Sequence, residues 1–287
     1  MVHDINNTME AGPEPKLGYA LFYGSIMALG LPLNAVSLWI LLRHHSLKTP
    51  SAVFMVNLAI SDLLLVISLP MRVYFYATGT WPLSGGACTL ITMLFRDNIR
   101  SSSIFITFIS VDRLLAVVYP LRSRHLRTAC NALKAVGLAW LIVLVINIPQ
   151  RVKFSRFLES YNKSTCFEFP QQQPQISAMV YPQPVLVLTM LAVNIVCTTL
   201  VSWTLHTHLS DSARVNNKIN VMLIFVMNLV MFIICFLPLS LSLLINGTAP
   251  PPLVCLATVN CCLDPLLYYF SLDAFWKKKE DADLPRE

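Results

Sequence analysis

Long apolar stretches recur seven times along the 287 residues, separated by short polar or proline- and glycine-bearing breaks. A bilayer core about 30 Å thick needs a helix of roughly 20 mostly apolar residues to cross it. Each stretch is long enough to do so, and no break is long enough to hold a soluble domain. The apolar stretches cover residues 17–42, 51–77, 87–119, 131–150, 176–206, 218–245 and 251–270.

This pattern predicts an all-α membrane protein, a seven-transmembrane-helix bundle, with residues 17–270 as its membrane domain. Residues 1–16 are polar and lack the apolar core of a cleavable signal peptide, so the first helix is expected to act as its own insertion signal. Residues 271–287 place leucine, phenylalanine and tryptophan beside a run of lysines. That arrangement predicts a short amphipathic eighth helix on the membrane lipids, followed by a tail. The composition agrees, because 13% charged residues are too few to cover a soluble domain of this size.

Lysine and arginine are concentrated on one side of the predicted bundle. Cytoplasmic loops carry the excess of these residues, so the tail is expected in the cytoplasm and the N-terminus outside the plasma membrane. The basic residues of the inner side are Arg43, Lys48, Arg122, Arg124, Arg127, Lys134, Arg214, Lys218, Lys277, Lys278, Lys279 and Arg286. Sequons for N-glycosylation begin at Asn6, Asn162 and Asn246, all on the opposite side. Since glycan acceptors are extracellular, the sequons favour the same orientation.

Several amide, hydroxyl and carboxyl groups lie inside the predicted spans, where burial in hydrocarbon is costly. They are Asn34, Asp62, Asn98, Ser102, Asn260 and Asp264. These side chains either hydrogen-bond between helices as structural contacts or form a functional centre. Two carboxylates among neutral oxygen donors also suit a hydrated hard cation.

Two further features of the spans indicate a moving part. Arg113 follows Asp112 at the inner end of the third span. This arginine either reaches the lipid headgroups or pairs with the adjacent carboxylate in a contact that a partner breaks. Pro238 follows Phe236 in the sixth span and Pro265 lies in the seventh. An interior proline removes a backbone hydrogen bond and kinks the helix, so these positions are predicted pivots.

Three arginines, Arg72, Arg96 and Arg100, lie deep in the spans on the outer side. Arg96 and Arg100 are four residues apart and therefore share a helix face, where Asp97 can neutralise at most one of them. Guanidinium groups match phosphate and carboxylate geometry, which predicts an anion-binding pocket. The alternative is that Asp97 and backbone carbonyls satisfy these arginines internally.

Together these residues and their order resemble rhodopsin-like G-protein-coupled receptors. The residues that carry the resemblance are Asn34, Leu58-Ala59-Ile60-Ser61-Asp62, Cys88, Asp112-Arg113, Trp140, Cys235-x-x-Pro238 and Asp264-Pro265-x-x-Tyr268. They cover nearly the whole chain. The resemblance implies a receptor that passes an extracellular chemical signal to a heterotrimeric G protein.

The resemblance also implies a role for each matching residue. Cys88 and Cys166 would join the second outer loop to the third span. Asp112 would restrain Arg113, which meets the G protein, and Tyr268 would turn inward on activation. The sodium-linked activation network would comprise Asn34, Asp62, Ser102, Asn260 and Asp264.

Within this family, four runs are most similar to the branch that holds nucleotide and lysophospholipid receptors, with the non-Edg lysophosphatidic acid receptors nearest. The runs are Ser68-Leu69-Pro70-Met71-Arg72, Ile109-Ser110-Val111-Asp112-Arg113, Cys166-Phe167-Glu168-Phe169-Pro170 and Asn260-Cys261-Cys262-Leu263-Asp264-Pro265. The resemblance, with the apolar surroundings of the arginines, implies an anionic lysophospholipid such as lysophosphatidic acid. A nucleotide or another small carboxylate is the alternative. Arg151, Lys153 and Arg156 are expected in the next outer loop, where they would steer an anion inward.

One segment departs from the family pattern, because only 26 residues separate Pro238 from Pro265. The segment is either a compact loop or a deletion that leaves a non-signalling decoy receptor.

Other classes of protein fit the sequence less well. A transporter or channel would be expected to show internal repeats, and none is seen between the halves. No nucleophile–histidine–carboxylate set, metal-ligand spacing or glycine-rich phosphate loop occurs, so an enzyme is not expected. We expect no nucleic-acid partner and no cofactor other than an allosteric sodium ion.

Overall fold

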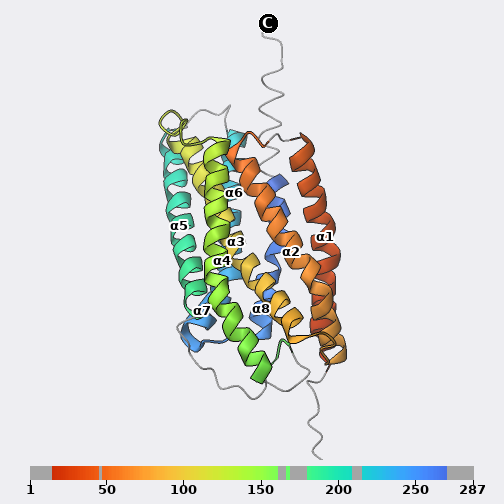
Figure 1. Cartoon of the computed structure of the whole chain (residues 1–287). Helices are drawn as coiled ribbons and strands as arrows, with labels where there is room; N and C mark the ends of the chain where they lie inside the picture. Colours follow the sequence, from red (N-terminus) through yellow and green to blue (C-terminus); the bar gives the residue numbers. More distant parts are fainter. Residues whose placement is uncertain (1–14, 45–46, 161–165, 169–179, 209–214, 270–287) are drawn as a thin grey trace, which may run out of the picture.

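The computed structural model describes residues 15–44, 47–160, 166–168, 180–208 and 215–269. In this part of the chain, seven helical segments are long and apolar enough to cross a membrane, which confirms the predicted seven-helix bundle. Figure 1 shows the helices running side by side, with α1 and α5 at opposite edges of the view. The predicted eighth helix and the first two sequons, at Asn6 and Asn162, lie outside the described residues.

The first five spans are single helices, and the sixth and seventh are interrupted. The bounds are α1 Leu17–His44, α2 Pro50–Thr78, α3 Gly85–Val118, α4 Ala129–Ser160 and α5 Pro182–His208. The sixth span consists of α6 Val215–Met231, a π-helical turn η3 Phe232–Phe236, and α7 Leu237–Asn246. The seventh begins with α8 Pro251–Thr258, turns once at Val259 and is helical again as far as Tyr269, the last described residue.

Large apolar side chains remain exposed around the outside of the bundle. Examples are Leu21 on α1, Ile148 on α4 and Trp203 on α5. A contiguous surface of this kind is unfavourable in water and is covered when lipid tails surround the helices. The polar side chains named above are instead turned inward, where Asn34, Asp62 and Asp264 are fully buried.

Helix α4 corrects one boundary predicted from the sequence. The apolar run stops near residue 150, but the helix continues to Ser160. Arg151, Lys153 and Arg156 are therefore helical and exposed rather than part of a loop. The reason is that this stretch contains no glycine and no further proline, and that arginine and lysine are good helix formers. The helix therefore continues beyond the end of the apolar run.

The sixth span contains the predicted irregularity, one turn earlier than Pro238. The backbone N–H of Leu237 donates to the carbonyl of Phe232, five residues back, which makes a single π-helical turn. Pro238 has no N–H and its ring displaces the carbonyl four residues before it, and the wider turn accommodates both effects. Whether Phe236, Pro238 and Pro265 act as pivots stays a prediction.

The short segment after Pro238 forms a compact loop. Gly247 ends α7 with φ 66°, a left-handed conformation that suits glycine, and its N–H donates to Leu243 at 3.1 Å. The hydroxyl of Ser242 donates to the carbonyl of Thr248 at 3.0 Å, and α8 starts at Pro251. The chain therefore reverses within a few residues and still builds a seventh span.

Candidate functional site

Arg72 of α2 is the most unusual side chain in the half of the bundle that contains the Cys88–Cys166 disulfide. Only 4% of it is exposed, and among the described residues no hydrogen bond or ion pair reaches its guanidinium group. Three aromatic rings surround the group instead, with centroids at 5.8 Å for Tyr23, 4.9 Å for Phe95 and 4.3 Å for Phe167. Cation–π contacts offset part of the desolvation of a buried cation but supply no counter-charge. The aromatic cage of Tyr23, Phe95 and Phe167 therefore holds a cation to which the described part of the chain supplies no anion.

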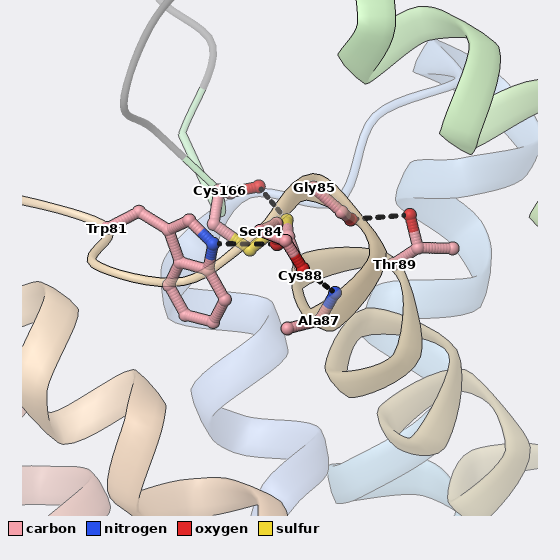
Figure 2. Close-up of a disulfide and its surroundings, with 7 residues drawn as sticks. All are labelled: Trp81, Ser84, Gly85, Ala87, Cys88, Thr89 and Cys166. Carbon is pink, nitrogen blue, oxygen red and sulfur yellow. Dashed lines mark hydrogen bonds between the residues drawn. A yellow bond between two sulfur atoms is a disulfide. The ribbon is translucent and has the colours of Figure 1, made fainter.

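The ring of Phe167 is held over Arg72 by the segment 166–168. Cys166 is joined to Cys88 near the start of α3, which confirms the predicted disulfide, and Figure 2 shows this bond beside Trp81. Phe167 packs against Phe75 and Trp81, with ring centroids at 5.3 and 5.6 Å.

The next residue ties the same segment to the first helix. Glu168 pairs with Lys16, whose Nζ lies 2.6 Å from its carboxylate, so the segment also contacts the start of α1. The Phe167 ring thus covers the Arg72 site from the loop side.

Arg100, by contrast, has partners inside the protein for both terminal nitrogens, whereas its Nε has no hydrogen-bond partner among the described residues. Its side chain is fully buried and bonds to residues of three helices. Nη1 lies 3.4 Å from Asp97, and Nη2 donates to Gln150 of α4 and to Gln183 of α5, the latter at 3.4 Å. Asn147 of α4 donates to the second oxygen of Asp97 at 2.7 Å. Arg100 thus pairs with Asp97, as the internal alternative expected, but its other acceptors are two glutamine side chains rather than backbone carbonyls.

Arg96, one turn before Arg100, is half-buried and contacts α4 nearer to the end of that helix. Its guanidinium lies 6.0 Å from the ring centroid of Phe154 on α4. The described residues give it no ion pair or hydrogen bond. Of the three deep arginines, Arg72 and Arg96 are thus the two without a carboxylate partner in this part of the chain, and Arg72 is the more buried of them.

The predicted sodium-linked residues form a buried polar cluster only in part. Asn98 donates to Asp62 at 2.9 Å and to Ser102 at 3.2 Å, joining α2 and α3. Asp264 and Asn260 of the last span are fully buried as well. One oxygen of Asp62, both of Asp264 and the amide of Asn260 are buried without a hydrogen-bond partner among the described residues.

Asn34 is linked to this cluster through backbone rather than through a carboxylate. Its amide donates to the carbonyls of Gly30 at 3.0 Å and Cys261 at 2.7 Å, which joins α1 to the last span.

At the other end of α3, the structure corrects the predicted partner of Asp112. Arg127, not Arg113, pairs with this carboxylate, with Nε 2.8 Å from Oδ1 and Nη2 3.4 Å from Oδ2. Ser51 at the start of α2 donates to Oδ2 at 2.5 Å. Successive side chains of a helix point in different directions, so Asp112 faces α2 and the segment before α4 while Arg113 does not.

Arg113 and Tyr268 have no comparable contacts. Arg113 is half-buried and Tyr268 fully buried, and the described residues offer neither side chain a hydrogen bond. Their predicted roles in coupling stay predictions, as does glycosylation of Asn246, which is exposed at the end of α7.

Sequence reasoning missed the residues that surround these groups. They are Tyr23, Phe95 and Phe167 around Arg72, Gln150 and Gln183 around Arg100, and Ser51 and Arg127 around Asp112. Only Phe167 carried a signal, because it follows the loop cysteine that was expected to bond to α3. The others depend on how the helices are rotated against one another, which the apolar pattern does not fix.

Comparison with known proteins agrees with the resemblance to rhodopsin-like receptors. The sequence profile of the family described as 7 transmembrane receptor (rhodopsin family) matches residues 33–268. The chain is 33% identical over 282 residues to lysophosphatidic acid receptor 6 of Gallus gallus, covering 89% of this chain and 90% of the relative. It is 33% identical to human lysophosphatidic acid receptor 4, covering 89% and 74% of the two chains, and 34% identical to lysophosphatidic acid receptor 5 of Bos taurus, covering 90% and 76%. A profile match over most of the chain, with its seven spans and the Cys88–Cys166 disulfide, shows that this chain belongs to the rhodopsin family of seven-transmembrane receptors.

Proposed function

We propose that this receptor binds lysophosphatidic acid, or a lysophospholipid of very similar structure, at its outer end and activates heterotrimeric G proteins at its inner end. The observation that carries the proposal is Arg72, a buried guanidinium that has three aromatic neighbours and, among the described residues, no carboxylate partner. A phosphate monoester supplies the missing charge in the bidentate geometry that arginine favours. The relatives named lysophosphatidic acid receptors support this class of ligand.

A lipid suits the surroundings of Arg72 better than a nucleotide does. A pocket of about 430 Å³ lies between the outer ends of α1 and α8. Its lining is mostly apolar and includes Tyr19, Phe22 and Pro252 together with Lys16. Tyr19 packs on Tyr76, with ring centroids 5.2 Å apart. Tyr76 in turn stacks on Tyr23 of the aromatic cage at 5.6 Å. An acyl chain can therefore occupy apolar space close to the buried cation, whereas a nucleotide would place its polar base and ribose there.

A G-protein activation screen tests the proposal. Membranes carrying the wild-type receptor are exposed to 1-oleoyl lysophosphatidic acid, to adenine and uridine nucleotides, and to small carboxylates, with Arg113→Ala as the uncoupled control. We expect activation by the lysophospholipid alone, and none in Arg113→Ala. Activation by a nucleotide but not by the lipid would contradict the ligand class, and a receptor at full surface density that responds to no class of ligand would indicate a decoy.

The orientation assumed here places the ends of α2 and α3 that carry Ser51 and Asp112 in the cytoplasm. It rests on the excess of lysine and arginine at that end and on the sequons at the other. The same assignment makes the receptor a multi-pass plasma-membrane protein with its N-terminus outside.

We also propose that the polar cluster around Asp62 and Asp264 holds a sodium ion. The buried oxygens without hydrogen-bond donors are the kind of ligand that hard cations prefer, so the residues fit the ion. Asp62, Ser102 and Asp264 would hold it, with Asn260 beside them. A bound cation supplies charge neutralisation for the two carboxylates.

Replacing sodium by choline in the assay buffer is expected to raise agonist potency in the wild type by at least about 5-fold, because an ion bound preferentially to the resting form opposes activation. Asp62→Asn removes one charged ligand and is expected to abolish this difference. Ser68→Ala, a buried serine of the same helix bonded only to its own backbone at Leu65, is the matched control and keeps the difference. Equal potency of the wild type in both salts would contradict a sodium site.

A further inference from the structure

The contact between Asp112 and Arg127 involves both carboxylate oxygens. Arg127 Nε lies 2.8 Å from Oδ1 and Nη2 lies 3.4 Å from Oδ2, while Ser51 donates to Oδ2. The Asp112 side chain is 4% exposed and that of Arg127 is 28% exposed. A forked arginine contact with a buried carboxylate is stronger than an exposed ion pair, because water screens it less.

The segment between α3 and α4 is folded so that Arg127 reaches this position. Ser123 is buried at its centre, and its hydroxyl donates to the carbonyl of Leu115 on α3 at 3.0 Å. The N–H of Ser123 donates to Tyr119 at 3.0 Å, and the N–H of Arg127 donates to Ser123 at 2.9 Å. The loop therefore bends back along the end of α3. Its hydrogen bonds through Ser123 hold the backbone of Arg127 where the side chain reaches Asp112.

The consequence for Arg113 is that its neighbouring carboxylate is already occupied. Arg113 makes no ion pair within the described ranges, and its Nε is buried without a hydrogen-bond partner there. To pair with Asp112, Arg113 would have to displace a two-point contact and the hydroxyl of Ser51. The competition between Arg113 and Arg127 for one carboxylate thus favours Arg127.

We propose that Arg127 is a positioning residue for G-protein coupling: by holding Asp112, it keeps Arg113 available to the G protein. The inference rests on membership of the receptor family and on the inner location of this end of the bundle. It does not depend on which ligand the outer site takes. Loss of Arg127 would release Asp112 to Arg113 and so reduce coupling, whereas loss of Asp112 would leave Arg113 without any competing carboxylate.

Agonist-free nucleotide exchange tests the proposal. The receptor is fused to representatives of each major Gα class, and GTPγS uptake is normalised to receptor density. Arg127→Gln is expected to lower exchange by roughly 5-fold, within the usual range of coupling between two sites. The double variant Arg127→Gln/Asp112→Asn is expected to regain at least the wild-type rate, and Arg127→Lys to lie between. Arg124→Gln, an exposed arginine of the same segment, is the matched control and leaves the rate unchanged.

The double variant separates positioning from a purely structural role of the loop. If Arg127 only shaped the surface that meets the G protein, Arg127→Gln/Asp112→Asn would be as slow as Arg127→Gln, and the proposal would be wrong. An unchanged rate in Arg127→Gln alone would also overturn it.

A second measurement needs neither ligand nor G protein. Asp112→Asn and Arg113→Gln are combined, and melting temperatures of the purified receptor are compared in two backgrounds. With Arg127 present, the two substitutions are expected to be additive; in Arg127→Gln they are expected to be non-additive, because Arg113 and Asp112 then pair. Additivity in both backgrounds would show that Arg113 never takes the place of Arg127.

Discussion

Replacing Arg72 with methionine is expected to weaken lysophosphatidic acid by at least about 30-fold in G-protein activation, since removing one partner of a buried charge pair costs roughly 2 kcal/mol or more. Methionine fills much of the same volume and its sulfur packs well on the aromatic cage of Tyr23, Phe95 and Phe167. The variant therefore removes the charge while keeping the cage filled.

The same substitution is expected to leave the melting temperature of the ligand-free receptor nearly unchanged. The described residues give the Arg72 guanidinium no carboxylate, so its removal strands no buried anion. Arg96→Met is the matched control, because Arg96 is another deep outer arginine without an ion pair but is less buried; we expect a loss of potency below about 5-fold, since a partly exposed charge is screened by water. A variant Arg72→Met that binds the lipid normally would contradict the proposed site, and one that fails to fold would show that Arg72 is structural.

Arg100→Met, unlike Arg72→Met, is expected to destabilise the receptor. We expect a loss of roughly 3–5 kcal/mol in the free energy of unfolding. Arg100 bonds to Asp97, Gln150 and Gln183, which come from three helices. Without the arginine, Asp97 becomes a half-buried carboxylate to which Asn147 donates from another helix, and the oxygens of Gln150 and Gln183 lose the Arg100 donor. The packing of α3 against α4 and α5 is then weakened at its polar centre.

Thermal unfolding of the detergent-purified receptor checks this expectation. Arg96→Met, one turn away on the same helix, removes an arginine that has a distant ring contact and no ion pair among the described residues, and it is expected to cost less than about 1 kcal/mol. Adding Asp97→Asn to Arg100→Met is expected to recover part of the loss, because it removes the uncompensated charge. A melting temperature for Arg100→Met equal to that of the wild type would show that the Arg100 contacts do not hold these helices together.

The contrast between Arg72 and Arg100 illustrates what the sequence could and could not predict. Both arginines were expected in an anion pocket, because each lies deep on the outer side and only Asp97 is nearby in the chain. The glutamines that satisfy Arg100 lie 50 and 83 residues away, so their approach depends on the rotation of α4 and α5. Periodicity places a residue at a depth in the membrane but not opposite a given partner.

The number of spans was predictable for a simpler reason. Hydrophobic length alone sets it, and the hydrocarbon core permits few alternatives to a helix. The end of α4 was not predictable in this way, because Arg151, Lys153 and Arg156 end the apolar pattern without breaking the helix. The disulfide was predictable from the resemblance, whereas the partner of Asp112 required the fold of the segment around Ser123.

The proposal that the ligand's phosphate completes the charge of Arg72 is tested most directly by changing the residue and the phosphate together. Binding of 1-oleoyl lysophosphatidic acid and of 1-oleoylglycerol, which lacks the phosphate, is measured on the purified wild-type receptor and on Arg72→Met. In the wild type, the phosphate is expected to strengthen binding by at least about 30-fold; in Arg72→Met, this advantage falls below about 3-fold. If the phosphate strengthened binding equally in both proteins, Arg72 would not be the residue that receives it.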